Sequence, residues 1–141
     1  MGKNQTRGKG GNAGILDGVA TSLPALLRGQ TLQKKAARVG FDWPDVEPVY
    51  EKLAEEIAEI REAVSQNNQA AIEAEIGDLL FSAVNLARKL GVDAETALSG
   101  ANKRFLTRFR HIEQTLGAEG REVEGTSLEE LDRIWEQAKR A

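Results

Sequence analysis

The sequence predicts an all-α protein, a helical bundle of about four main helices and a short C-terminal helix, without a sheet. Apolar residues recur every three or four positions from Ser22 onward, which is the period of an amphipathic helix. Glycine, proline and Asx residues separate these periodic segments, as is typical of helices joined by short turns. The length of 141 residues suits one ordinary domain with its own core.

The first two predicted helices are separated by a connector that contains a proline. We expect the first helix to begin at an N-cap, Ser22, and to close at Gly40. Pro44 disfavours helical backbone in the residue before it, and Asp45 can cap the next helix. The second helix is therefore predicted over about residues 46–65.

The third predicted helix is joined to the second by the polar residues 66–69. A turn this short makes the two helices antiparallel neighbours. The third helix is predicted over about residues 70–90, and Gly91 stops it. The apolar residues of both helices that are expected to face inward are Val49, Leu53, Ile57, Ile60, Val64, Ile72, Ile76, Leu79, Leu80, Ala83, Leu86 and Leu90.

Two further helices complete the predicted bundle. Asp93 can cap a fourth helix that ends at Gly117, and Ser127 with Glu130 forms a capping box at the start of the fifth. The apolar residues expected to face inward here are Leu98, Ala101, Phe105, Phe109, Ile112, Leu116, Leu128, Leu131 and Ile134.

Composition excludes several classes of protein. The absence of cysteine excludes a disulfide scaffold, a thiolate zinc site and a cysteine nucleophile. The single histidine, His111, excludes a multi-histidine metal site. No apolar run approaches the roughly 20 residues that span a bilayer, and no secretory signal is apparent. We therefore expect a cytoplasmic protein without a membrane partner.

Residues 1–14 are predicted to form a flexible Gly-rich tail, and residues 15–141 the domain. The tail holds five glycines and too few apolar side chains to offset the entropy of ordering. It carries three basic residues and no acid, so the domain is more acidic than the net charge of −3 for the whole chain indicates. An acidic domain argues against a nucleic-acid partner.

Four acidic residues form a candidate metal site. Glu56 and Glu59 lie three residues apart in the second helix, and Glu75 and Asp78 lie three apart in the third. Residues at this spacing share a helix face, so two antiparallel helices can turn all four carboxylates toward one another. Apolar neighbours surround Glu75 and Asp78, so at least one acid is expected to be partly buried and to need a partner.

The identity of that partner stays open on this reasoning. The positive charge could come from Lys52, from one of the basic residues of the fourth helix, or from a metal ion. A site built only from oxygen ligands favours a hard cation, Mg²⁺ with Mn²⁺ as a possible substitute. The alternative is a solvent-facing acidic surface, in which case the matched spacing on two neighbouring helices is a coincidence.

Basic and aromatic residues extend the candidate site. Arg104 and Arg108 share one face of the fourth helix, and guanidinium groups bind phosphate through paired hydrogen bonds. Pairing of these arginines with helix acids explains them equally well. Trp43 and Trp135 could each stack on a base, although packing in the core is the more common role of tryptophan.

The pattern Glu56-x-x-Glu59, fifteen intervening residues and Glu75-x-x-Asp78 resembles the signature of the MazG-type all-α nucleoside triphosphate pyrophosphohydrolases. The resemblance covers about residues 15–141 and is strongest to the C-terminal domain of bacterial MazG. The stretches that carry it beyond the signature are LDGV at 16–19, LPAL at 23–26, VGFDW at 39–43, GDLLF at 77–81, VNLAR at 84–88 and ANKRF at 101–105, with Arg108-Phe109.

The resemblance implies that the four acids hold Mg²⁺ and that Glu55 or Glu56 orients or deprotonates the attacking water. The substrate-binding residues that it implies are Lys52, Arg104 and Arg108 at the triphosphate, and Asn85 and Trp135 near the nucleotide. It also implies a homodimer or homotetramer. The expected function is Mg²⁺-dependent hydrolysis of ribo- or deoxynucleoside triphosphates to monophosphate and pyrophosphate, by attack of water at the α-phosphorus.

Two alternatives to this function stay open. One is a narrower hydrolase on the same scaffold, acting on phosphoribosyl-ATP or dUTP. The other is a non-catalytic helical interaction module, in which the acids face solvent. A di-iron carboxylate bundle is disfavoured, because such bundles use Glu-x-x-His pairs and this sequence has none.

Overall fold

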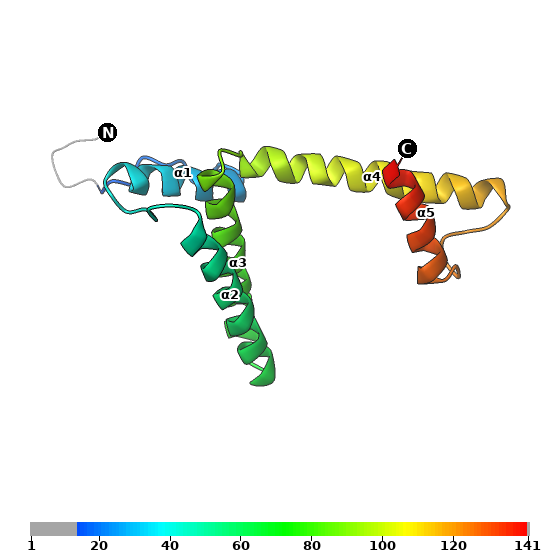
Figure 1. Cartoon of the computed structure of the whole chain (residues 1–141), viewed down its shortest axis with the longest axis horizontal. Coiled ribbons are helices and arrows are strands. Elements are labelled where there is room, and N and C mark those ends of the chain that lie inside the picture. Colours follow the sequence, from blue (N-terminus) through cyan, green and yellow to red (C-terminus); the bar gives the residue numbers. More distant parts are fainter. Residues whose placement is uncertain (1–13, 141) are drawn as a thin grey trace. The chain divides into compact units, whose positions relative to one another are not determined.

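The computed structural model describes residues 14–140, which are mostly helical (Figure 1). The five helices are α1 (Ala25–Arg38), α2 (Glu47–Ser65), α3 (Gln69–Lys89), α4 (Ala94–Ala118) and α5 (Leu128–Arg140). No strand occurs between residues 14 and 140, which confirms the predicted all-α class. The predicted tail, apart from Gly14, lies outside the described residues.

The chain divides into two compact units, Met1–Glu95 and Thr96–Ala141. The first unit contains α1, α2, α3 and the first residues of α4. The second contains the rest of α4 and α5. All four acids of the candidate metal site belong to the first unit.

Helices α2 and α3 form an antiparallel hairpin, as the short polar turn predicts, and α1 packs against α3 (Figure 1). Asn67 adopts a φ of 52° in the turn, a conformation that asparagine tolerates better than most residues. Asn68 then caps α3, because its Oδ1 accepts a hydrogen bond of 3.1 Å from the Ala71 N–H. These two asparagines fix the direction in which α3 returns along α2.

Two of the predicted helix ends are wrong. The N-cap of α1 is Pro24, without a side-chain cap, rather than Ser22. Helix α4 continues through Gly117 and ends before Gly120, which adopts a φ of 68° and donates its N–H to the Gly117 carbonyl. A helix accommodates an interior glycine at a cost of about 1 kcal/mol, so Gly117 did not have to be a stop. The predicted end of α1 at Gly40 is confirmed by its φ of 97°.

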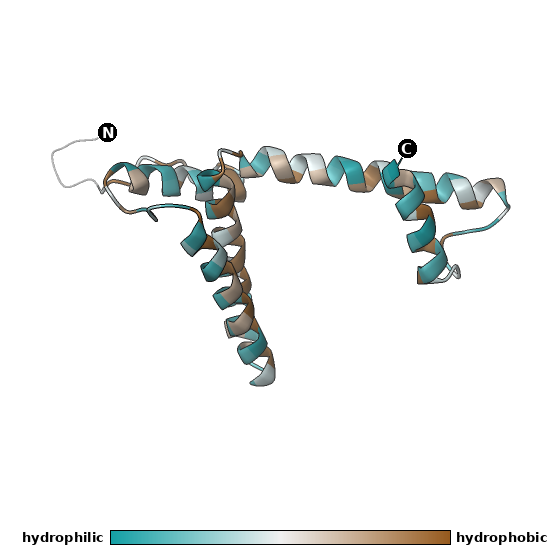
Figure 2. Cartoon of the chain, in the orientation of Figure 1, coloured by the Kyte–Doolittle hydropathy of each residue, from teal (hydrophilic) through white to brown (hydrophobic). Residues whose placement is uncertain are grey.

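The hairpin buries only part of the apolar face that its periodicity predicts. Val49, Ala63 and Val84 are buried between the helices of the first unit. Several larger apolar residues predicted to face inward are exposed instead, namely Ile57, Val64, Ile76, Leu80 and Leu90. Figure 2 shows hydrophobic residues, in brown, along both helices of the hairpin. The reason is geometric, since two helices with only α1 packed on α3 leave the remaining apolar side uncovered.

The second unit has a small core of its own. Ile112 and Leu116 of α4 are buried against Ile134 of α5, and Trp135 packs on this cluster. The predicted capping box forms in one direction, because Ser127 Oγ accepts a hydrogen bond from the Glu130 backbone N–H at 3.2 Å. Leu98, Phe105 and Leu128 were predicted to face inward but are exposed.

Candidate active site

The candidate metal site lies between α2 and α3 and is centred on Glu56. Only 2% of Glu56 is exposed, an unusual burial for a carboxylate. One carboxylate oxygen from each of Glu56, Glu75 and Asp78 lies within 4.8 Å of the others. The same holds for Glu55, Glu56 and Glu59. The two groups share Glu56, so the hairpin brings together all four acids predicted to bind a metal.

The hairpin geometry accounts for this convergence. Val49, Glu56 and Ala63 follow one another at seven-residue intervals and are the buried residues of α2. Glu56 therefore occupies the α2 face that packs against α3, where an apolar side chain would ordinarily lie. Glu75 and Asp78 come from the facing helix, one turn apart.

The charges in this cluster are poorly compensated by the protein itself. Glu56 Oε2 and Glu75 Oε2 are both buried and neither has a hydrogen-bond partner. Among residues 14–140, Lys52 is the cation that forms ion pairs with these acids: its Nζ lies 2.9 Å from Glu55 Oε2 and 3.4 Å from Glu56 Oε1. The hydrogen bond with Glu55 is the main reason why the pKa of Lys52 is raised. Lys52 is partly exposed and pairs only with Glu55 and Glu56. In the described part of the chain, neither Glu75 nor Asp78 forms an ion pair.

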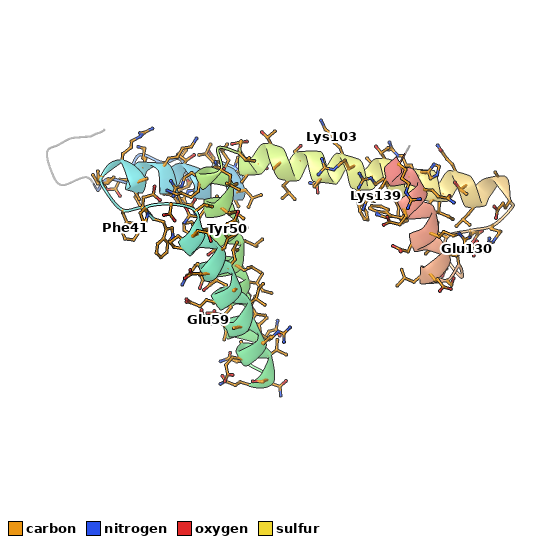
Figure 3. All side chains as sticks on the ribbon, viewed as in Figure 1. Phe41, Tyr50, Glu59, Lys103, Glu130 and Lys139 are labelled. Atoms are coloured by element: carbon orange, nitrogen blue, oxygen red, sulfur yellow. The ribbon has the colours of Figure 1, made fainter. Side chains whose placement is uncertain are left out.

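The pKa of Glu59 reflects the same repulsion between neighbouring acids. The pKa of this carboxyl is raised to about 7. The largest cause is a hydrogen bond shared with the Glu56 carboxyl, followed by desolvation and by the negative charge of Glu75. Figure 3 marks Glu59 on α2. A divalent cation among these oxygens would remove the repulsion, and the all-oxygen donor set fits Mg²⁺ or Mn²⁺.

A cavity of about 440 Å³ lies farther along α3 in the same unit. Its walls come from the segment before α1, from α1, from the α1–α2 connector and from α3. The residues that line it are Leu16, Leu32, Gln33, Ala36, Gly40, Phe41, Asp42, Trp43, Phe81, Asn85 and Arg88. Asn85 lies seven residues after Asp78, which corresponds to about 10 Å along the helix axis.

Ion pairs hold the connector against α3 at this cavity. Arg88 donates to both carboxylate oxygens of Asp42, at 2.6 and 3.2 Å, and also to Asn85 Oδ1 at 2.6 Å. Lys89 donates to the Trp43 carbonyl at 2.8 Å. The hydrogen bonds from Arg88 are the main reason why the pKa of Asp42 is lowered to about 2. The Asn85 carbonyl is occupied by Arg88, so the amide N–H₂ is the group left for a ligand.

Sequence reasoning missed Asp42 and Arg88 as residues of this site. The available signal was local, since Arg88 follows Asn85 by three residues and Asp42 precedes Trp43. Trp43 lines the cavity and is 40% exposed, so core packing is wrong for this tryptophan. Phe41 is even more exposed (Figure 3).

The other predicted substrate residues, Arg104, Arg108 and Trp135, lie in the second unit. The Arg108 guanidinium lies over the Trp135 ring, 5.6 Å from its centroid. Neither arginine forms an ion pair within 4.0 Å with a carboxylate in the described part of the chain. Their contact with a substrate stays a prediction, as do the assigned roles of the acids.

None of the described helices combines the length and the apolar character that crossing a membrane requires.

Residues 45–113 match the family described as the MazG nucleotide pyrophosphohydrolase domain. This range includes the four acids, Lys52, Asn85, Arg104 and Arg108. It does not include Trp43 or Trp135.

Three bacterial proteins are similar to the chain over most of its length. It is 46% identical over 142 residues to a nucleoside triphosphate pyrophosphohydrolase of Escherichia coli K12, an alignment that covers 98% of this chain and 53% of that protein. It is 42% identical over 137 residues to a nucleoside triphosphate pyrophosphohydrolase/pyrophosphatase MazG of Thermotoga maritima, covering 97% and 52%. A Bacillus subtilis protein, YabN, is 44% identical over 126 residues, covering 89% and 26%. The chain thus spans about half the length of the first two relatives.

Proposed function

Because the chain belongs to the family of the MazG nucleotide pyrophosphohydrolase domain, we propose that it hydrolyses ribo- or deoxynucleoside triphosphates to monophosphate and pyrophosphate, with Mg²⁺ as cofactor. The observation that carries the proposal is the group of four acids centred on the buried Glu56, in which Glu56 Oε2 and Glu75 Oε2 have no hydrogen-bond partner among the described residues. Acids in such an arrangement are costly to the fold without a cation, which favours a metal site over a solvent-facing acidic surface.

In this proposal Glu56, Glu59, Glu75 and Asp78 hold the metal. A cation held there would make water more acidic and would neutralise charge on the phosphates. Glu55 or Glu56 accepts a proton from the water as its oxygen attacks the α-phosphorus. The bond from the α-phosphorus to the bridging oxygen breaks, and that oxygen leaves with pyrophosphate. No covalent intermediate with the protein is required.

The substrate would be held by cations and by the cavity. Lys52, Arg104 and Arg108 are the proposed ligands of the triphosphate, since ammonium and guanidinium groups bind phosphate oxygens well. We place the nucleoside in the cavity, because its walls combine the aromatic rings of Trp43 and Phe81 with the amide of Asn85. Trp135 is the other residue proposed to lie near the nucleotide, and its ring contacts the Arg108 guanidinium.

We also propose that the chain assembles as a homodimer or homotetramer. Tyr50, Ile57 and Val64 are all exposed on α2 at seven-residue intervals, and α3 adds exposed Ile76 and Leu80. This regular spacing is typical of a seam between packed helices. A second copy of the hairpin supplies a matching apolar surface, since the same residues recur on it.

The reaction can be tested with the purified chain in water labelled with ¹⁸O. Formation of monophosphate and pyrophosphate, with the label in the monophosphate, is expected if water attacks the α-phosphorus. Glu59→Ala and Asp78→Ala should abolish this activity, while Glu73→Ala, an exposed acid of α3 outside the cluster, should retain it. Label in the pyrophosphate, or release of a single phosphate, would contradict the proposed reaction.

Substrate range requires a second experiment, because phosphoribosyl-ATP and dUTP hydrolases use the same reaction type. A panel of ribo- and deoxynucleoside triphosphates with these two compounds separates the broad activity from the narrow ones. Turnover of several triphosphates at comparable kcat/KM is expected. Turnover of one compound alone would replace the broad proposal by the narrow one.

A further inference from the structure

Arg108 forms no ion pair with a carboxylate in the described part of the chain. Its guanidinium lies over the ring of Trp135, with the central carbon 5.6 Å from the ring centroid. This distance is within the range of a cation–π interaction, in which the negative face of the ring attracts the charge. Such a contact orients a guanidinium without neutralising it, so the charge of Arg108 stays available to an anion.

Arg121 in the same unit shows the opposite arrangement. Both of its terminal nitrogens donate to Glu130, at 2.6 and 2.7 Å, and one also donates to Glu119 at 3.1 Å. The fork of Arg121 is therefore saturated by carboxylates and is structural. Arg108 has the same chemical group, but no acid of residues 14–140 forms an ion pair with it.

The ring of Trp135 is held in place on other sides. It packs on the core cluster of Ile112, Leu116 and Ile134. The Phe105 ring approaches it at 5.4 Å between centroids, tilted by 52°. With the core, Phe105 and Arg108 around it, the indole is only partly exposed, and one of its ring faces is taken by the Arg108 guanidinium.

We infer that Trp135 is a positioning residue that holds the Arg108 guanidinium ready for the phosphate chain of the substrate, and that it does not itself stack on the nucleobase. The inference rests on the proposed function for the identity of the substrate. A guanidinium whose orientation is fixed in advance loses less conformational entropy when it binds an anion, which strengthens the binding of phosphate whatever base is attached.

Inorganic tripolyphosphate is the probe that tests this inference, because it has phosphates and no base. Calorimetry on the full chain with Mg²⁺ should show binding that Trp135→Leu weakens about two- to thirtyfold, the range expected for a lost cation–π contact. The milder Trp135→Phe, which keeps an aromatic face, should lose less. Arg108→Ala should weaken binding at least as much, and adding Trp135→Leu to it should cause no further loss.

The same variants should affect nucleoside triphosphates in one way for all bases. Trp135→Leu should change the KM of purine and pyrimidine substrates by similar factors. Arg110→Ala, which removes an exposed arginine of the same helix, is the control and should leave tripolyphosphate affinity unchanged. The helical circular dichroism of each variant must match that of the parent chain, since Trp135 also packs on the core.

Three outcomes overturn the inference. The first is tripolyphosphate affinity that is unchanged in both Trp135 variants while purine substrates lose more than pyrimidine ones, because this is the signature of base stacking. The second is additive losses from Arg108→Ala and Trp135→Leu, because independent residues add. The third is a parent chain that does not bind tripolyphosphate. A different outcome separates the two proposals. If the effects of Arg108→Ala and Trp135→Leu on tripolyphosphate affinity are non-additive but the chain does not hydrolyse nucleotides, the inference is supported and the proposed reaction is contradicted.

Discussion

Glu56 occupies a position that an apolar residue would fill in an ordinary helical hairpin. Its side chain is 3% exposed, and its nearest cation, the Lys52 ammonium, lies 3.4 Å away and is itself 40% exposed. The other neighbouring charges, Glu59, Glu75 and Asp78, are all negative. A fold that keeps four acids together in this way sacrifices stability for a binding site, a trade that is common at functional sites.

The metal-free chain should therefore become more stable when Glu56 loses its charge. Glu56→Gln keeps the volume and removes a buried, partly unpaired carboxylate. Urea unfolding without Mg²⁺ is expected to show a gain of about 1 kcal/mol in the free energy of unfolding. The stabilisation that Mg²⁺ gives to the parent chain should disappear in the variant. A loss of stability in the metal-free variant would contradict the repulsion described for this cluster.

The raised pKa of Glu59 predicts how the stability of the metal-free chain changes with pH. Its pKa is about 7 in the folded chain, against an ordinary value of 4.5, so the folded chain binds this proton more tightly than the unfolded chain. Stability is then lost as the pH rises from about 4.5 to 7. The metal-free melting temperature should fall across this window. Saturating Mg²⁺ or Glu59→Gln should flatten the curve, and an unchanged slope in Glu59→Gln would assign it to another group.

At the scale of the elements, the sequence was sufficient for the existence and order of the helices. Periodic apolar residues and the turn at Gln66–Gln69 predicted the α2–α3 hairpin, because these signals are local. The end of α4 was less predictable, since Gly117 and Gly120 are both near it and only the backbone conformation distinguishes them. Burial was predicted least well, because periodicity identifies an apolar face but not whether another element covers it.

The same distinction applies to the candidate site. The acids could be predicted, since a spacing of three residues on two helices joined by a short turn determines which faces meet. The cavity could not, because its walls come from four segments that meet only in the folded chain. The pairing of Arg88 with Asp42 spans 46 residues, so the spacing of residues within one helix does not reveal it.

Asn68 tests whether the turn contributes stability separately from the metal site. Asn68→Ala removes the side-chain acceptor of the Ala71 N–H, and loss of such a cap costs about 0.5–2 kcal/mol. Urea unfolding should show this loss with and without Mg²⁺. The additional stabilisation by Mg²⁺ should equal that of the parent chain, because the acids remain in place. A smaller Mg²⁺ effect would mean that the turn also sets the geometry of the acids.

At the scale of the whole molecule, the exposed apolar residues of the hairpin predict self-association. A 15.4 kDa chain that leaves Tyr50, Ile57 and Val64 exposed at heptad spacing presents a regular row of apolar side chains along α2 rather than scattered ones. Analytical ultracentrifugation should give a mass of two or four chains. Ile57→Glu places a charge within the proposed seam and should raise the dissociation constant at least about a hundredfold, since burying an unpaired charge costs several kcal/mol.

Leu128→Glu is the matched control for the self-association prediction. Leu128 is 81% exposed, more than Ile57, but it lies at the start of α5, outside the α2–α3 surface. If apolar exposure alone drove association, both substitutions would weaken it. The heptad surface predicts that only Ile57→Glu does. A parent chain that sediments as a monomer at micromolar concentration, or equal effects of the two substitutions, would show that the hairpin surface does not join copies of the chain.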